Sequence, residues 1–176
     1  IYNITICIIL MKLLSLKNII STLEAPKGRM QKIKYNDNMI VIDYAHTPDA
    51  LENVLETVKQ LKYDNIYTVI GCGGDRDKFK RKIMGEISTN LSDYVIFTSD
   101  NPRSEKIIDI INDMIEGIQK NNYEIIENRE SAIIRGIQLM GKSDILLILG
   151  KGHEEYQIIG NKKYDFSDQE IVQKNI

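Results

Sequence analysis

The sequence predicts an α/β fold built on a mostly parallel sheet with helices on both faces. From Met39 onward, short runs of β-branched residues alternate with amphipathic segments of helical spacing. In addition, the run ILLILG at 145–150 is apolar throughout, as in a strand buried on both faces. Strands and helices that alternate in this way favour a parallel sheet with right-handed crossovers.

Each element is predicted from its own pattern. IVI at 40–42 is the first expected strand, and Pro48 begins a helix through about Leu61, with Asp49 and Glu52 in the first turn, where the helix dipole favours acids. The later expected elements are strand 66–71, helix 77–91, strand 94–99, helix 105–119, a short strand near Ile125, helix 129–140, strand 145–150, a hairpin around Gly160 and a short helix from Ser167.

Composition excludes several classes of protein. With 43% hydrophobic and 27% charged residues, the 176-residue chain can bury a real core and is not intrinsically disordered. The 23 basic and 25 acidic residues leave a net charge of −2, so no global field attracts nucleic acid or an acidic membrane. Cys7 and Cys72 form no CxxC pair, which excludes a zinc ribbon or disulfide scaffold and favours a reducing cytoplasm.

The amino-terminal segment is expected to belong to a neighbouring domain. The chain opens at Ile1 with an apolar run, which suggests a piece of a longer protein. A membrane span needs roughly 20 apolar residues, and Lys12 and Lys17 interrupt this run too early. It also lacks the basic start and small-residue cleavage site of a signal peptide. We therefore expect a helix buried against another domain.

Four loops are expected to form the binding site, because ligands of parallel α/β sheets bind outside the carboxyl ends of the strands. Each follows a predicted strand and is rich in polar residues and glycine; the loops span 43–49, 71–76, 99–103 and 150–154. GCGGDRD matches neither the Walker nor the dinucleotide spacing. Its glycines still allow backbone to approach a ligand, and Arg76 would project there, although a plain strand-to-helix turn is the alternative.

The other three loops offer groups that suit a zwitterion. In DNPR, Arg103 can bind a carboxylate bidentately and Asp100 can accept from an ammonium; a helix cap with a solvated arginine is the alternative. GKGHE adds Lys151, His153 and Glu154, while Asp43 and His46 could contact a ribose or a phosphate. The sequence contains no nucleophile elbow and no metal-ligand spacing. A recognition site for an amino acid is therefore favoured over a self-contained catalytic centre.

Five strings in order resemble the Mur ligase family, most closely its MurE type. They are GRM at 28–30, DYAHTPDAL at 43–51, GCGGDRD at 71–77 with KRKIMG after it, DNPRSE at 100–105, and GKGHEEYQ at 150–157. The resemblance covers the chain from Asn3 to about Asp168. It implies that residues 1–29 end a central ATP-binding domain and that residues 30–176 form a Rossmann-like carboxyl-terminal domain that binds the incoming amino acid.

The resemblance also implies a reaction and its participants. The full-length family enzyme uses ATP and Mg²⁺ to form an amide between UDP-MurNAc-L-Ala-D-Glu and a diamino acid in peptidoglycan synthesis, in the cytoplasm. The family's phosphate-binding loop and carbamylated lysine have no counterpart in this sequence, so we expect no catalytic residue, no metal site and no ATP hydrolysis in this fragment. Its expected partners are these two substrates and its own other domains, with no nucleic acid and no membrane.

Site residues follow from the same resemblance. Those implied to hold meso-diaminopimelate are Arg76, Asp100, Asn101, Pro102, Arg103, Gly150 and Glu154. Those implied to lie toward the nucleotide are Asn3, Arg29, Asp43 and His46. The DNPR form resembles the diaminopimelate-adding branch, because the lysine-adding branch usually lacks that arginine. Departures from the family pattern, none at a ligand-binding position, occur at Gln31, Phe79, Lys82, Lys106 and Ile107.

Two other hypotheses stay open. One is a non-catalytic amino-acid-binding module or gene remnant, since the ATPase region is missing from the sequence. The other is a different ligase of the superfamily, such as the folate polyglutamylating type, against which DNPR and GKGHEEYQ argue.

Overall fold

The computed structural model of the chain describes residues 27–176, and within that range the α/β fold is as predicted. The expected helix near the amino terminus and Asn3 lie outside the described residues. The elements are β1 (Gln31–Tyr35), β2 (Asn38–Asp43), α2 (Pro48–Lys59), β3 (Ile66–Ile70), α3 (Phe79–Leu91), β4 (Tyr94–Phe97), α4 (Ile107–Ile115), β5 (Tyr123–Ile125), α5 (Arg129–Leu139), β6 (Ile145–Leu149), β7 (Tyr156–Ile159), β8 (Lys162–Asp165) and α6 (Asp168–Asn175).

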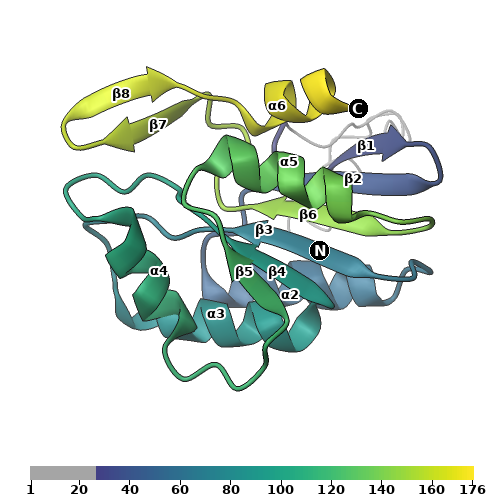
Figure 1. Ribbon diagram of the computed structural model, residues 1–176, viewed down its shortest axis with the longest axis horizontal. Coiled ribbons are helices and arrows are strands. Elements are labelled where there is room, and N and C mark those ends of the chain that lie inside the picture. The colour runs from purple at the N-terminus through teal and green to yellow at the C-terminus, as the bar shows by residue number, and fades with distance from the viewer. Residues whose placement is uncertain (1–26) are drawn as a thin grey trace, which may run out of the picture.

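A mixed sheet forms the middle layer of this part of the chain (Figure 1). Its six strands have the order β1-β2-β6-β3-β4-β5, and all neighbours are parallel except β1 and β2. Helices α2, α3 and α4 cover one face, and α5 and α6 cover the other (Figure 1). Each face has its own hydrophobic core, because alternate residues of every strand point to opposite sides.

The strand register aligns the four predicted loops at one edge. β6 lies between β2 and β3, and Leu149 pairs with both Asp43 and Ile70. Ile70 in turn pairs with Phe97 of β4. The loops that follow β2, β3, β4 and β6 therefore leave the sheet at the same level, which brings together residues more than a hundred positions apart in sequence.

The structure differs from the predicted elements in three places: one strand was missed and two helices have different bounds. β1 was not predicted, although it pairs with β2 along its full length. Helix α3 begins at Phe79 and not at 77, and in the turn before it the Asp77 carboxylate accepts a hydrogen bond from the Phe79 N–H at 2.9 Å. Helix α4 spans only Ile107–Ile115, and Gly117 follows it with a φ of +81°.

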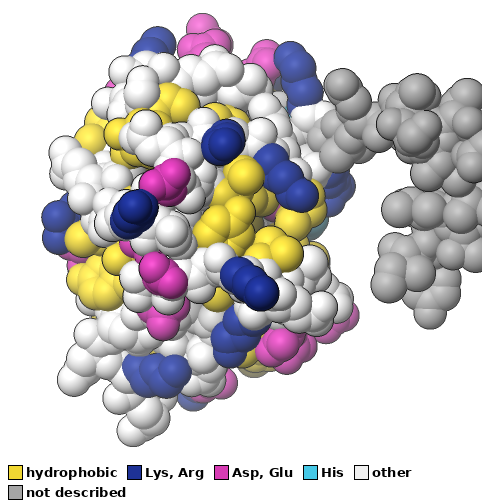
Figure 2. All heavy atoms as spheres, turned by 90° about the vertical axis from the view of Figure 1, so that its right-hand side faces the viewer, with side chains coloured by type: hydrophobic (Ala, Val, Ile, Leu, Met, Phe, Trp, Pro, Cys, Tyr) yellow, Lys and Arg dark blue, Asp and Glu magenta, His cyan; other side chains and the backbone are white. Residues whose placement is uncertain are grey.

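The predicted hairpin, β7 and β8, stands apart from the main sheet and is fixed to the loop after β4 (Figure 1). The Arg103 N–H donates to the Ile158 carbonyl at 3.0 Å, and the Gly160 N–H donates to the Arg103 carbonyl at 2.7 Å. On the face opposite to this end of the molecule, basic and acidic side chains are interspersed with hydrophobic ones (Figure 2). None of the helices within 27–176 is long and apolar enough to cross a membrane.

Candidate functional site: a cleft between four strand-end loops

A cleft of about 430 Å³ lies where the four predicted loops meet. Six of the seven residues expected to hold the amino acid line it, and Pro102 is buried behind it. The lining residues that the sequence singled out are His46, Arg76, Asp100, Asn101, Arg103, Gly150 and Glu154. The prediction that the four loops bring these residues together at one edge of the sheet is therefore confirmed.

Two glycines of the GCGG run allow the loop after β3 to lie directly against the loop after β4. A Cβ atom on Gly71 would lie 2.3 Å from the Thr98 carbonyl oxygen, and one on Gly74 would lie 1.9 Å from the Pro102 carbonyl oxygen. Both obstructing atoms belong to backbone, so a side chain at either position would push the loops apart. The glycines thus serve close packing of two loops, and neither phosphate-binding pattern is needed to explain them.

Two arginines form the basic side of the cleft. Arg76 and Arg103 flank Gly73, whose missing side chain leaves room for both. The Arg103 guanidinium donates through Nη1 to the Gly74 carbonyl at 2.8 Å and to the Asn101 carbonyl at 3.3 Å. Arg76 Nη1 donates to the Asp75 carbonyl at 3.0 Å. Each guanidinium has five N–H donors, so both retain donors for an anionic ligand.

Asp100 forms the deepest part of the acidic side. Its residue is only 9% exposed, and within residues 27–176 no hydrogen bond reaches its carboxylate. Burial raises the pKa of Asp100, while Lys151 and Arg129 oppose that rise. Gly150 leaves the space beside it open, since a Cβ there would lie 2.9 Å from Asp100 Oδ2. A buried carboxylate with free acceptor capacity suits a cationic ligand group.

Glu154 is the second acid, and it is held firmly. Its Oε2 accepts from Asn101 Nδ2 at 2.9 Å and from Lys151 Nζ at 3.1 Å, whereas Oε1 has only a 3.5 Å contact with the Tyr44 hydroxyl. Burial by itself would raise the pKa of Glu154, but the hydrogen bond from Asn101 and the charge of Lys151 lower it overall. The side chain is therefore an oriented carboxylate with Oε1 available.

Of the four residues expected near the nucleotide, the three within 27–176 occupy different settings. Asp43 does not line the cleft: its carboxylate accepts from the Met30 N–H at 2.7 Å and the Ala45 N–H at 2.8 Å, which makes it a structural clamp at the end of β2. Arg29 is exposed, and its guanidinium lies over the Tyr44 ring, 4.8 Å from the centroid. His46 is exposed at the rim of the cleft.

The sequence did not predict the roles of Lys151 and Tyr156. The Lys151 side chain is fully buried, and its ammonium contacts Asn101 Oδ1 at 3.2 Å in addition to Glu154. It also lies 5.5 Å from the centroid of the Tyr156 ring, which lines the cleft. One feature of the sequence could have indicated the role of Lys151. It follows the wholly apolar run 145–150, so it lies at the end of a buried strand, where a lysine needs an acidic partner.

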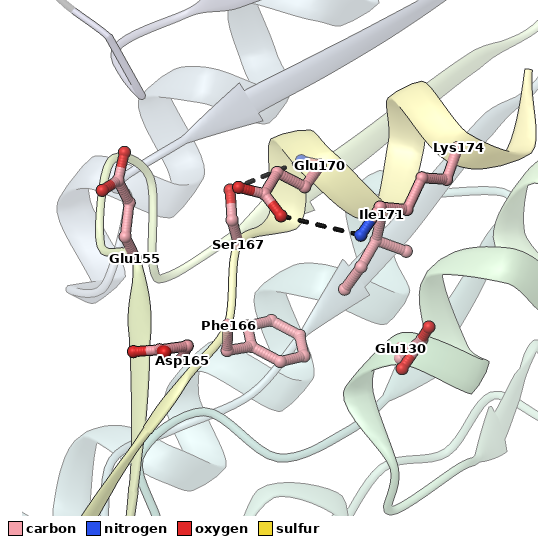
Figure 3. A pocket seen from close by; sticks show the side chains of 8 residues that line it. All are labelled: Glu130, Glu155, Asp165, Phe166, Ser167, Glu170, Ile171 and Lys174. Carbon is pink, nitrogen blue, oxygen red and sulfur yellow. Dashed lines mark hydrogen bonds and ion pairs between the residues drawn. The ribbon is translucent and has the colours of Figure 1, made fainter.

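A second hollow, of about 450 Å³, lies beside α6 and collects acidic side chains (Figure 3). Its acids are Glu130, Glu155, Asp165 and Glu170. Within 27–176, no group of His, Cys, Asp or Glu side chains could hold a metal ion. None of the predicted site residues lines this hollow, so the cleft between the four loops remains the candidate site.

A comparison with protein families matches residues 28–152 to the family described as "Mur ligase, glutamate ligase domain". Among curated proteins, two diaminopimelate ligases of Clostridium acetobutylicum are similar to this chain. One, UDP-N-acetylmuramoyl-L-alanyl-D-glutamate--2,6-diaminopimelate ligase 1, is 46% identical over 91% of the chain and 34% of its own length. The other, ligase 2, is 51% identical over 90% of the chain and 33% of its length. The chain thus spans about a third of these relatives.

Solved structures give the same picture. The chain superposes on a UDP-N-acetylmuramoyl-L-alanyl-D-glutamate--2,6-diaminopimelate ligase with a TM-score of 0.82 and 40% identity, covering 90% of this chain and 33% of that one. E. coli FolC in complex with ADP shares the fold only, with a TM-score of 0.54 and 19% identity over 71% of this chain and 28% of that one.

Proposed function

Since the chain belongs to the Mur ligase family, we propose that its cleft binds meso-diaminopimelate and supplies this amino acid to a longer ATP-dependent amide ligase of peptidoglycan synthesis. The named relatives are diaminopimelate ligases at 46% and 51% identity. Because the chain spans about a third of their length, the activity belongs to the longer protein and the amino-acid site belongs to this part of it.

The arrangement of charges in the cleft carries the proposal. Diaminopimelate has two ammonium groups and two carboxylates, whereas lysine has only one carboxylate. The cleft is lined by the guanidinium groups of Arg76 and Arg103 and by the carboxylates of Asp100 and Glu154. Lys80 and Asp77 also line it, but both are engaged by backbone: Lys80 Nζ donates to the His46 carbonyl at 2.8 Å, and the Asp77 carboxylate accepts from the Phe79 N–H at 2.9 Å. A bidentate contact from Arg103 would bind the second carboxylate. With lysine bound, that arginine would lack its partner, which is a strong basis for rejecting the shorter amino acid.

The residues of the cleft would bind and orient the substrate in the proposed reaction. ATP would convert the D-Glu carboxylate of UDP-MurNAc-L-Ala-D-Glu to an acyl phosphate, and the amino group of diaminopimelate would attack that carbonyl and release phosphate. Asp100 and Glu154 would hold the ammonium end of the substrate, and Asn101 and Gly150 would shape the space between them. The nucleophile would be the other amino group, after it has lost a proton, and fixing the ammonium end places that nitrogen with little further loss of entropy.

ATP and Mg²⁺ belong to the longer enzyme. Within residues 27–176 no side-chain group fits a metal ion, so no step is assigned to Mg²⁺ here. Arg29, exposed beside Tyr44, and His46, at the rim of the cleft, fit a role toward the phosphates or ribose of a nucleotide. Asn3 is assigned to the nucleotide by the family pattern alone. The free, buried thiol of Cys72 fits a cytoplasmic protein.

Two alternatives make different predictions. A non-catalytic module would bind diaminopimelate without a continuing ligase upstream, which the neighbouring coding sequence would reveal. A folate polyglutamylating ligase would bind glutamate, which lacks a second ammonium. The two acids of the cleft, Asp100 and Glu154, favour a ligand with more cationic groups than glutamate has.

Calorimetric titration of the chain with meso-diaminopimelate, L-lysine and L-glutamate tests the proposal. We expect diaminopimelate to bind at least about tenfold more tightly than either other amino acid, a difference of about 1.4 kcal/mol. Arg103→Gln should weaken diaminopimelate binding by roughly 30-fold or more, because the second carboxylate of the ligand loses its cationic partner, and should not weaken lysine binding. Arg135→Gln, on α5 and paired with Glu124, is the matched control. Tighter binding of lysine or glutamate would contradict the proposal.

A further inference from the structure

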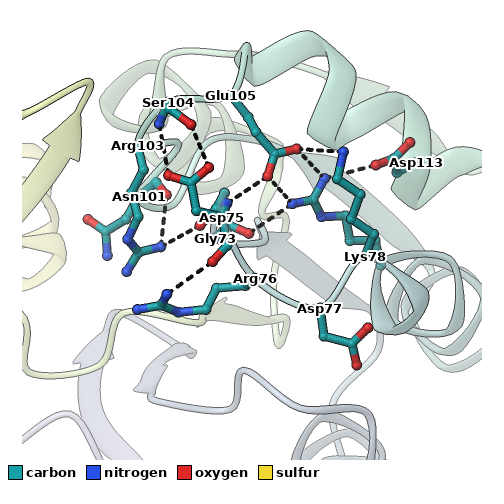
Figure 4. Close-up of polar contacts among 12 residues, drawn as sticks. Gly73, Asp75, Arg76, Asp77, Lys78, Asn101, Arg103, Ser104, Glu105 and Asp113 are labelled. Carbon is teal, nitrogen blue, oxygen red and sulfur yellow. Dashed lines mark hydrogen bonds and ion pairs between the residues drawn. The ribbon is translucent and has the colours of Figure 1, made fainter.

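The peptide group that joins Gly74 to Asp75, in the loop after β3, links Arg103 in the cleft to the carboxylate of Glu105 outside it (Figure 4). The carbonyl of Gly74 accepts from Arg103 Nη1 at 2.8 Å. In the same peptide unit, the N–H of Asp75 donates to Glu105 Oε1 at 2.6 Å. The C=O and N–H of a trans peptide are coplanar and point in opposite directions. Fixing the N–H end therefore also fixes the carbonyl that orients Arg103.

Glu105 is itself held by a buried cation. Arg81, whose side chain is fully buried, donates to Glu105 through Nη1 at 2.9 Å and through Nη2 at 2.8 Å. Lys78 Nζ adds a contact at 3.2 Å. The hydrogen bonds from Arg81 lower the pKa of Glu105 to about 2, so the acid is a carboxylate at neutral pH. Four donors on one carboxylate leave it little freedom to move.

The loop is tied at a second point, through Asp75. This residue has a φ of +53°, a left-handed conformation that a non-glycine residue adopts only when its surroundings hold it. Its carboxylate accepts from the Ser104 hydroxyl at 2.5 Å and from the Ser104 N–H at 3.2 Å. Its own carbonyl accepts from Arg76 Nη1 at 3.0 Å. Two consecutive carbonyls, of Gly74 and Asp75, therefore each orient one arginine of the cleft.

From these contacts we infer that Glu105 is a positioning residue for the cleft: it holds the Gly74–Asp75 peptide and, through it, orients the Arg103 guanidinium toward the carboxylate of a ligand. The selectivity part of this inference rests on the proposed function. Glu105 is not among the residues of 27–176 that line the cleft.

Asp113 provides a matched comparison. It binds the same guanidinium, accepting from Arg81 Nη1 at 2.8 Å. It lies on α4, however, and no hydrogen bond within 27–176 links it to the loop after β3. If the Arg81 cluster served stability alone, Glu105→Gln and Asp113→Asn would affect binding alike. If Glu105 positions Arg103, only Glu105→Gln changes the preference for diaminopimelate over lysine.

The test measures the affinity of the 176-residue chain for meso-diaminopimelate and for L-lysine by calorimetry, together with the thermal midpoint. In Glu105→Gln, we expect diaminopimelate affinity to fall about tenfold and lysine affinity to change by less than about twofold. In Asp113→Asn, the ratio of the two affinities should stay within about twofold of the wild-type ratio, although the midpoint falls. An unchanged ratio in a folded Glu105→Gln chain would overturn the inference.

A second readout keeps this test separate from the proposed function. The side-chain Nε–Hε signal of Arg103 can be assigned by its loss in Arg103→Gln. It should be a single sharp signal in the wild type and in Asp113→Asn, and broadened or moved in Glu105→Gln. If the wild type fails to prefer diaminopimelate, the proposed function is wrong, while this signal still decides whether Glu105 positions Arg103. Should Glu105→Gln not fold, Ser104→Ala is expected to disturb the Arg103 signal, and an undisturbed signal would count against the inference.

Discussion

At the scale of single residues, the site combines a buried acid without a partner and a second acid that is fully oriented. The Asp100 carboxylate accepts no hydrogen bond within residues 27–176, and its pKa is raised by burial. Glu154 is held by Asn101 and Lys151, and its pKa is lowered overall. The two carboxylates therefore differ in what a ligand gains from them. An ammonium that reaches Asp100 offsets the cost of burying its charge. Glu154, whose orientation is already fixed by Asn101 and Lys151, presents Oε1 to a ligand without further ordering.

Asp100 should make diaminopimelate affinity depend on pH. Its folded-state pKa is raised by burial, so it takes up a proton at a higher pH than an exposed aspartate does, and the neutral form cannot pair with an ammonium. Affinity should therefore rise with pH through that raised pKa. The charged groups that act on it are Lys151 and Arg129, which oppose the rise, and Glu154 and Asp168, which add to it.

Asp100→Asn should bind diaminopimelate about tenfold or more weakly at neutral pH and lose most of this pH dependence, which calorimetry across the acid range would measure. Glu154 has a lowered pKa and is expected to titrate at more acid pH. A pH dependence that persists in Asp100→Asn would assign it to another group.

At this scale, the sequence predicted residues that line the cleft but not those that hold them in place. Arg76, Arg103 and Asp100 lie in the loops that follow β3 and β4, where the position of the loop indicates a site. Lys151 and Glu105 act through partners 50 and 30 positions away in sequence, and no local pattern shows such pairs. The structural role of Asp43 was also not predicted: backbone N–H groups in its own loop and beside it donate to both its oxygens.

At the scale of elements, a buried ion pair fastens α6 to α5 directly beneath the cleft. Arg129, the first residue of α5, donates to both oxygens of Asp168 at 2.8 Å. It also donates to the carbonyls of Ser99 and Leu149, at the ends of β4 and β6. Both side chains of the pair are at most 1% exposed. One guanidinium thus joins two helices and two strand ends.

Asp168→Asn should therefore destabilise the chain by about 3 kcal/mol, because it leaves a buried guanidinium without its counter-charge. The free energy of unfolding from chemical denaturation would measure this loss. Glu170→Gln on the same helix removes an exposed pair with Lys174, in which both side chains are more than two-thirds exposed, and should change the free energy by less than about 0.5 kcal/mol. Equal losses in the two variants would show that burial of the Arg129 pair does not matter.

Most elements could be predicted from periodicity, and the exceptions have physical reasons. The apolar run of β6 and the hairpin around Gly160 appear where expected. β1 reads QKIKY, and its lysines are exposed on an edge strand. Such lysines protect an edge from unwanted pairing, but they also hide the strand from a hydrophobic pattern. Helix α4 is shorter than predicted at both ends. At its start, Glu105 is engaged in tertiary contacts, and after its end the chain turns at Gly117.

At the scale of the whole molecule, the strand order turns separate motifs into one site. Sequence alone indicated that the loops share one edge, since parallel strands all end there. It did not indicate that β6 inserts between β2 and β3, which is a long-range pairing with no local signal. This insertion places Gly150 and Glu154 beside the loops that carry Asp100 and Arg103. The hairpin then fixes the loop after β4 through the backbone of Arg103.

The central claim is that these four loops bind one diamino acid. Backbone amide NMR shifts of the chain, followed while meso-diaminopimelate is added, test it most directly. The largest shifts should fall in 71–76, 100–103 and 150–154, with much smaller changes when L-lysine is added instead. Shifts confined to the acidic hollow beside α6, or equal responses to the two amino acids, would contradict the account.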